Sequence, residues 1–211
     1  GCGMKTESLG GFDRFRVPAA LLVIAIHTGP LLSLNGEANY LLTDILARIA
    51  VPFFFSVSGW FLVPRLLREG RAALIPFVKK LLLYLPLNLY NHTLEESGFA
   101  LLRDVLFNGT FYHLWYFPAL VLGACLVYGL LRILGPRWAW LPALLLYAAG
   151  LLGDSYFGLT AALPPLRAGY EALFLLFDYT RNGLFFPPVF LLLGGWLALR
   201  PARRSAAWYG A

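Results

Sequence analysis

The chain has 211 residues, of which 59% are hydrophobic and only 13% are charged, and its net charge is +6. A soluble domain is usually about 45–50% apolar and about 25% charged, so this composition excludes an ordinary soluble fold. Several apolar stretches approach the roughly 20 residues that are needed to cross a bilayer core. These stretches are unbroken, whereas a transmembrane barrel shows short alternating segments. We therefore expect an all-α integral membrane protein.

Six candidate membrane spans follow one another along the chain, at about 17–34, 41–63, 73–91, 112–134, 138–157 and 183–199. Two further segments, 98–109 and 159–183, are amphipathic or broken by proline, and we expect them to be interfacial or re-entrant. The expected membrane domain covers 12–200. It lies between an N-terminal tail over 1–11, whose first three residues look like an expression remnant, and a C-terminal tail over 201–211. No cleavable signal peptide is expected.

The basic residues predict the orientation of these spans. If the N-terminus lies inside, 13 of the 17 Lys and Arg residues fall in cytoplasmic segments. Cytoplasmic loops of membrane proteins are enriched in Lys and Arg, so we expect both ends of the chain in the cytoplasm. The positive charge then reflects topology and requires no nucleic-acid partner. The expected partner is the lipid bilayer, and the expected location is the cytoplasmic membrane of a bacterium.

An arginine and a histidine mark the first apolar segment. Arg16 and His27 are separated by ten residues, which on a continuous helix places them about 20° apart around the axis and roughly 16 Å apart along it. Pro18 suits a first helical turn, so we expect the regular helix to begin near Val17 and to leave Arg16 just outside it. A histidine inside a membrane must find a polar partner there. Two interpretations of His27 stay open, a structural hydrogen bond and a functional role, and Arg16 is either a topology charge or part of a site.

Three segments resemble a known family. The first holds Asp13, Arg16 and His27; the second is RIAVPFFFSVSGWFL at 48–62; the third is YHLWYFPALVLG at 112–123. In this order they resemble the membrane acyltransferase 3 family. The stretches at 91–120 and 180–199 most resemble the membrane domain of vancomycin-resistance serine racemases, in which a soluble racemase domain follows the membrane part.

The resemblance implies transfer of an acyl group, commonly acetyl, from a cytoplasmic coenzyme A thioester to a hydroxyl or amine at or beyond the membrane. His27 would act as the general base or carry the acyl group, and Arg16, on the same helix face, is the second candidate catalytic residue. A guanidinium binds phosphate oxygens at two points, so the other arginines at the cytoplasmic mouth are candidates for holding coenzyme A: Arg14, Arg65 and Arg68. Acyl-coenzyme A is the expected co-substrate, and no tightly bound cofactor is expected.

Other polar residues are candidates for supporting roles. Asp13 either pairs with an arginine or caps the first helix. Ser58 lies in a Ser-Gly step that suits close helix packing, and it either packs or lines the acyl path. His113 and Asn182 are candidates for an acceptor entrance at the outer boundary, where Tyr116 is a typical interface anchor. The two cysteines predict no disulfide, and no metal site is expected.

Two other functions stay open. The chain has fewer spans than the family's full set and no racemase domain, so we expect either a fragment or an unusually short member. In a racemase-like protein, Arg16 and His27 would instead line a path for serine across the bilayer. A membrane anchor for an absent racemase domain is the third interpretation. An acyltransferase needs a cleft that admits coenzyme A, a transporter needs alternating access, and an anchor needs neither.

Overall fold

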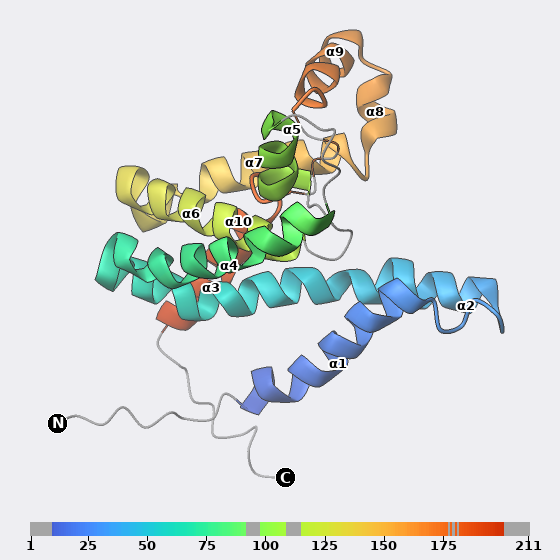
Figure 1. The fold of residues 1–211 in the computed structure, drawn as a ribbon, viewed down its shortest axis with the longest axis horizontal. Helices are drawn as coiled ribbons and strands as arrows, with labels where there is room; N and C mark the ends of the chain where they lie inside the picture. Colours follow the sequence, from blue (N-terminus) through green and yellow to red (C-terminus); the bar gives the residue numbers. More distant parts are fainter. Residues whose placement is uncertain are drawn as a thin grey trace. The chain divides into compact units, whose positions relative to one another are not determined.

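The structure is a computed structural model, and it describes residues 10–91, 98–108, 115–176, 178, 180 and 182–200. All regular elements in these ranges are helical, and Figure 1 shows them in chain order. The chain divides into two compact units, Gly1–Val57 and Ser58–Ala211. The division falls inside one helix, α3 (Ala50–Glu69).

The first unit begins with helix α1 (Gly10–Thr28), which carries Pro18 in its interior. The prediction that this helix begins near Val17 is therefore wrong. Proline lacks the N–H that would donate to the carbonyl four residues earlier, and for that reason it favours the first turn. Here the helix continues despite the missing donor, and its backbone extends to Gly10 on the N-terminal side.

Helix α1 ends earlier than the predicted span 17–34. The Gly29 N–H donates to the carbonyl of Ala25 at 3.0 Å, and the φ of Gly29 is +53°. Glycine adopts this left-handed conformation without the steric cost that a side chain would add, and it commonly ends helices in this way. The Thr28 hydroxyl donates to the carbonyl of Ile24 at 3.0 Å. Residues 30–34 then form turns rather than helix.

The remainder of the first unit is irregularly helical. Asn35 caps the short helix α2 (Gly36–Tyr40), because its side-chain oxygen accepts from the N–H groups of Glu37 and Ala38 at 2.9 and 3.1 Å. A π-helical segment, Leu41–Leu46, and a 3-10 turn, Ala47–Ile49, lead into α3. Helix α1 packs against both segments. The predicted span 41–63 thus becomes a regular α-helix only from Ala50.

The second unit contains the longer apolar helices. After α3 come a 3-10 turn (Gly70–Leu74), α4 (Ile75–Asn91), α5 (Gly98–Arg103) with a π-helical extension (Asp104–Asn108), α6 (Tyr116–Trp138), α7 (Trp140–Gly153), α8 (Phe157–Ala161), α9 (Pro164–Leu173) and α10 (Pro187–Leu199). In the described ranges two helical runs are long and apolar enough to cross a membrane, Ala50–Leu83 and Tyr116–Trp138. Helices α7 and α10 are shorter apolar helices. The helical class is as predicted, and the count of six spans is not confirmed.

Glycines allow the core helices of this unit to approach closely. A Cβ added to Gly59 of α3 would overlap the backbone of Leu191 in α10, with the Leu191 Cα only 2.6 Å away. Four residues further along both helices, Gly195 of α10 lies against the side chain of Val63 in α3. Helix α6 joins the contact, because a Cβ at Gly123 would lie 2.8 Å from the Cβ of Pro187. Small residues at helix contacts are typical of membrane helix packing.

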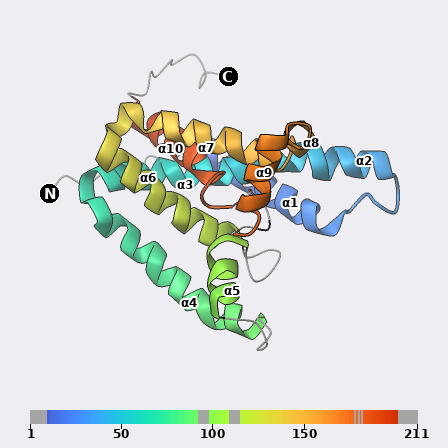
Figure 2. The same ribbon diagram turned by 90° about the horizontal axis from the view of Figure 1, so that it is seen from above.

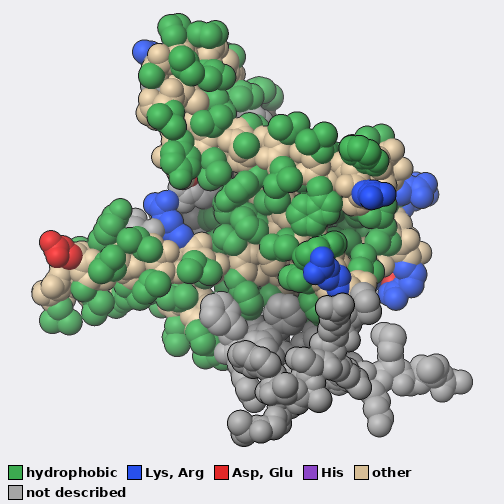
Figure 3. All heavy atoms as spheres, turned by 180° about the vertical axis from the view of Figure 1, so that it is seen from behind, with side chains coloured by type: hydrophobic (Ala, Val, Ile, Leu, Met, Phe, Trp, Pro, Cys, Tyr) green, Lys and Arg blue, Asp and Glu red, His purple; other side chains and the backbone are tan. Residues whose placement is uncertain are grey.

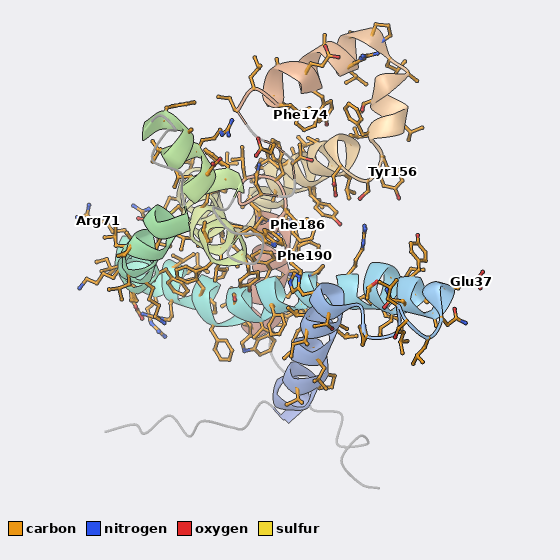
Figure 4. All side chains as sticks on the ribbon, turned by 45° about the vertical axis from the view of Figure 1, so that its right-hand side comes forward. Glu37, Arg71, Tyr156, Phe174, Phe186 and Phe190 are labelled. Carbon is orange, nitrogen blue, oxygen red and sulfur yellow. The ribbon has the colours of Figure 1, made fainter. Side chains whose placement is uncertain are left out.

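An aromatic cluster fills the space between α7 and α10. The ring of Tyr147 lies 5.8 Å from that of Phe186 and 5.4 Å from that of Phe190, measured between centroids. The rings of Phe186 and Phe190 are themselves 5.1 Å apart, on successive turns of the chain (Figure 4). Such offset and edge-on ring pairs contribute about 0.5–1.5 kcal/mol each beyond the apolar area that they bury.

The C-terminal ends of α3, α6 and α10 lie at the same end of the second unit (Figures 1 and 2). The turn Gly70–Leu74 contacts α6 there. The basic residues on these helix ends and on the start of α4 are Arg65, Arg68, Arg71, Lys79, Lys80, Arg132, Arg137 and Arg200. Figure 3 shows Lys and Arg side chains grouped along one edge beside a broad hydrophobic face, and Arg71 points outward in Figure 4. We call this region the basic end. Its side of the membrane stays a prediction.

Helices α8 and α9 form a hairpin beyond the end of α7 (Figure 1). Tyr170 of α9 is buried, and its hydroxyl donates to the carbonyl of Ala149 in α7 at 2.6 Å. Thr180 donates to the carbonyl of Gly150 at 2.7 Å. Burial raises the pKa of the Tyr170 phenol, so the hydroxyl stays a hydrogen-bond donor. The hairpin occupies much of the predicted interfacial segment 159–183, and α5 occupies part of the predicted segment 98–109.

Candidate functional site

Arg16 and His27 lie on one unbroken helix, α1, so the backbone supports the predicted spacing along one face. His27 lies in the last turn, with its side chain exposed, rather than near the middle of an apolar span. For Asp13, Arg14 and Arg16, the structure describes the backbone only. The 3-10 turn that carries Arg48 packs against the same helix.

Arg65 and Arg68 converge on a single carboxylate in the last turn of α3. The Nη2 of Arg65 lies 3.1 Å from Oε2 of Glu69, and its Nε also donates to that oxygen at 3.3 Å. The Nη2 of Arg68 lies 3.0 Å from Oε1 of Glu69. The prediction that both guanidinium groups share one side of the helix is confirmed. These pairs are largely exposed, so they add little stability, but they orient two guanidinium groups that retain further free N–H donors.

Ser58 lies at the crossing of α3 with α6. Its Oγ is 3.5 Å from the hydroxyl oxygen of Tyr116, the first residue of α6. Both side chains are half-buried. The adjacent Gly59 contacts α10, so this part of α3 is held on two sides. The geometry supports the packing interpretation of Ser58, and it directs Tyr116 toward α3.

Asn182 is fully buried in the segment that precedes α10. Its side-chain oxygen accepts from the N–H of Leu184 at 3.0 Å, and its backbone carbonyl accepts from the N–H of Phe186 at 3.2 Å. A Cβ at the neighbouring Gly183 would lie 2.8 Å from the Cα of Ala119 in α6. This placement favours a structural role in the approach to α10. His113, the other predicted acceptor-side residue, lies outside the described residues.

Almost the whole chain matches the model of one protein family. The acyltransferase domain of the acyltransferase 3 family matches residues 9–210. The chain belongs to the acyltransferase 3 family. The match runs through both compact units and includes α1, which carries Arg16 and His27. No solved structure matches this chain.

Curated relatives of this acyltransferase 3 chain carry racemase names. An amino-acid racemase of Enterococcus faecalis is 43% identical over 209 residues, which cover 94% of this chain and 29% of the relative. A serine/alanine racemase of Enterococcus gallinarum is 42% identical over 213 residues, covering 92% of this chain and 30% of the relative. The chain therefore spans less than a third of the length of these relatives. The predicted resemblance to the membrane part of serine racemases is confirmed.

Sequence reasoning missed two partners of the predicted site residues. Glu69 is the fourth residue after Arg65, a helical spacing at which opposite charges meet, and it directly follows Arg68. That pattern could have identified it. Tyr116 meets Ser58 across 58 positions of sequence, and such a contact depends on how α3 and α6 cross. In the described ranges, no group of three or more His, Cys, Asp or Glu side chains could hold a metal ion.

Proposed function

We propose that this chain is the membrane part of an acyltransferase. It moves an acyl group from a cytoplasmic coenzyme A thioester to a hydroxyl or amine acceptor at or across the membrane. Acetyl is the acyl group that we propose. The observation that carries the proposal is the family match over residues 9–210, with Arg16 and His27 on one continuous helix inside it. Acyl-coenzyme A serves as co-substrate. The setting is the cytoplasmic membrane of a bacterium.

The proposed step needs a base and a phosphate anchor. His27 takes the proton from the acceptor as the acceptor oxygen or nitrogen attacks the thioester carbon. The carbon–sulfur bond breaks, and the thiolate of coenzyme A leaves and is then protonated. Arg16, about 16 Å away along α1, holds the phosphate end of the donor. Arg14, Arg65 and Arg68 contribute further positive charge for that end, and Asp13 supports the arginines.

The proposal requires the phosphate-binding arginines to face the cytoplasm. We expect cysteines introduced at Met4 and Ser205, in a background in which Cys2 and Cys125 are replaced by serine, to react with a membrane-impermeant maleimide only after the cells are permeabilised. The physical reason is the excess of Lys and Arg in the segments assigned to the inside. A cysteine at Glu37, on the expected outer side, is the control and should react in intact cells. Labelling of Met4 or Ser205 from outside would reverse the orientation and exclude contact with cytoplasmic coenzyme A.

A conservative replacement tests the phosphate contact. Arg16→Lys keeps the positive charge but loses the planar fork that binds phosphate at two points. We expect coenzyme A to bind roughly tenfold more weakly to this variant, as for the loss of one charge-assisted hydrogen bond. The measurement is coenzyme A affinity in detergent by isothermal titration, with Arg137→Lys as a matched control. Equal affinity of wild type and Arg16→Lys would leave Arg16 as a topology charge.

The racemase names of the relatives favour a second candidate function. Because the chain covers under a third of those proteins, it would be the membrane domain of a racemase, and Arg16 and His27 would line an L-serine path. A plain anchor for the racemase domain is the remaining alternative. Uptake of labelled serine by proteoliposomes, without thioester consumption, identifies the transporter. Absence of both activities in the complete protein identifies the anchor.

A further inference from the structure

A recess opens between the ends of α3 and α6, at the basic end of the second unit. Its volume is about 350 Å³. Apolar side chains on both helices form its walls: Leu66, Leu67 and Leu131. At its edge Gly70 has a φ of +62°, and a Cβ there would lie 3.7 Å from the hydroxyl oxygen of Tyr128. The left-handed glycine turns the chain from α3 toward α4 beside this hydroxyl.

Cationic and hydrogen-bonding groups line the recess beside the leucines. Arg68 comes from α3, and Tyr128 and Arg132 come from α6. Among the described residues, Arg132 has no acidic partner, and the hydroxyl of Tyr128 has no hydrogen-bond partner. Arginine and tyrosine N–H and O–H groups are the donors that phosphate oxygens accept from. Two unused donor groups therefore lie in one apolar-walled hollow.

The acidic residue of the recess is already neutralised. Glu69 accepts from both Arg65 and Arg68, with nitrogen–oxygen distances of 3.1 and 3.0 Å. Together with Arg132, these arginines outnumber the one carboxylate by two charges. An anion that enters the recess would meet a net positive field. Its repulsion by Glu69 is offset by the guanidinium groups of Arg65 and Arg68, which pair with that carboxylate.

We propose that this recess binds the phosphate of an anionic phospholipid from the leaflet that surrounds the basic end. Arg132 and Tyr128 donate to the phosphate oxygens, and the leucine walls contact the glycerol and the first carbons of the acyl chains. Basic pockets between membrane helices are suited to anionic lipid headgroups. The inference rests on the membrane setting proposed above, but it does not depend on acyl transfer.

The size and lining of the recess favour a lipid over a soluble phosphate compound. Sites for drug-sized molecules occupy about 300–1,000 Å³, so a volume of about 350 Å³ admits a phosphate with its glycerol but not a whole coenzyme A molecule. The leucines that form the walls would make no favourable contact with a free phosphate ion. A phospholipid satisfies the polar and the apolar parts of the lining with one molecule.

The test measures lipid affinity without any turnover. The whole 211-residue chain is purified in a neutral detergent, and its binding of dioleoyl phosphatidylglycerol is measured by native mass spectrometry. We expect Arg132→Gln to weaken this binding about tenfold and Tyr128→Phe about threefold. The matched control Arg137→Gln removes a cation on the same helix outside the recess, and we expect its affinity to stay within about twofold of wild type.

Two further measurements distinguish lipid binding from donor binding and from a loss of folding. Coenzyme A in excess should leave phosphatidylglycerol bound to the wild type, whereas its displacement would assign the recess to the donor site and overturn the proposal. Unfolding temperatures without lipid show whether a variant is folded. Arg132→Lys supplies a second variant that keeps the charge but loses the planar fork, and its affinity should fall between those of wild type and Arg132→Gln. Unchanged affinity in Arg132→Gln and Tyr128→Phe, or equal losses in Arg137→Gln, would also overturn it. Acyl-transfer results bear on none of these outcomes.

Discussion

Replacing His27 with alanine should lower the rate of acyl transfer by about 10²–10⁴-fold, the usual contribution of a positioned general acid or base. The side chain lies in the last turn of α1 and is exposed in this structure, so its removal leaves no cavity in the core. We therefore expect expression and folding to be nearly unchanged. The measurement is thioester consumption by the complete protein with its native acceptor, beside size-exclusion chromatography and thermal unfolding of the same sample.

A neighbouring variant controls for changes in the helix end. Thr28 lies in the same turn, and its hydroxyl donates to the carbonyl of Ile24 at 3.0 Å. Thr28→Ala should keep the rate within about twofold, because this bond is exposed and local. A folded His27→Ala protein with wild-type turnover would refute the role of His27 as base. An aggregated variant would instead support the structural interpretation, in which the imidazole serves mainly as a hydrogen-bond partner.

Replacing Gly59 with alanine should destabilise the second unit by about 1–3 kcal/mol, as expected when atoms are forced into a tightly packed contact. The new Cβ would overlap the backbone of Leu191, which cannot turn aside as a flexible side chain could. Helices α3 and α10 would have to separate, and the contact of Gly195 with Val63 would loosen with them. The measurement is the thermal unfolding temperature in detergent.

Gly129 in α6 provides the matched control. A Cβ at this position would meet no atom within 4 Å. Alanine favours the helix over glycine by about 1 kcal/mol, so Gly129→Ala should unfold at the same temperature as wild type or slightly higher. If Gly59→Ala were as stable as Gly129→Ala, the close contact between α3 and α10 would be excluded.

The sequence predicted the long apolar helices of the second unit with useful accuracy. The span 183–199 corresponds to α10, and 112–134 overlaps α6, because uninterrupted apolar runs are strong helical signals. The first unit was less predictable. Pro18 suggested a helix start although α1 extends back to Gly10, and the apolar residues of 41–49 form π-helical and 3-10 segments. Hydropathy does not distinguish these helix types.

The candidate site was predictable only where it depends on a single helix. The common face of Arg65 and Arg68 follows from their spacing, and so does the placement of Arg16 and His27 on α1. The contact of Ser58 with Tyr116 and the recess beside Tyr128 depend on how separate helices cross. Such crossings are set by small residues far apart in the chain, and one sequence alone does not reveal which of them meet.

The glycine contacts between α3 and α10 restrict how this protein can move. Val63 lies over Gly195, and Gly59 lies over Leu191, so each helix carries a protruding residue and, four residues away, a notch that receives one. Sliding by a fraction of a turn would press side chains onto backbone, and a slide of one full turn, about 5.4 Å, would set Val63 against Leu191 in one direction and Gly59 against Gly195 in the other, so neither step restores the fit. Helices α3 and α10 should therefore move together as one rigid unit. If the protein does pass serine by alternating access, the moving joint of the second unit lies elsewhere than between these two helices.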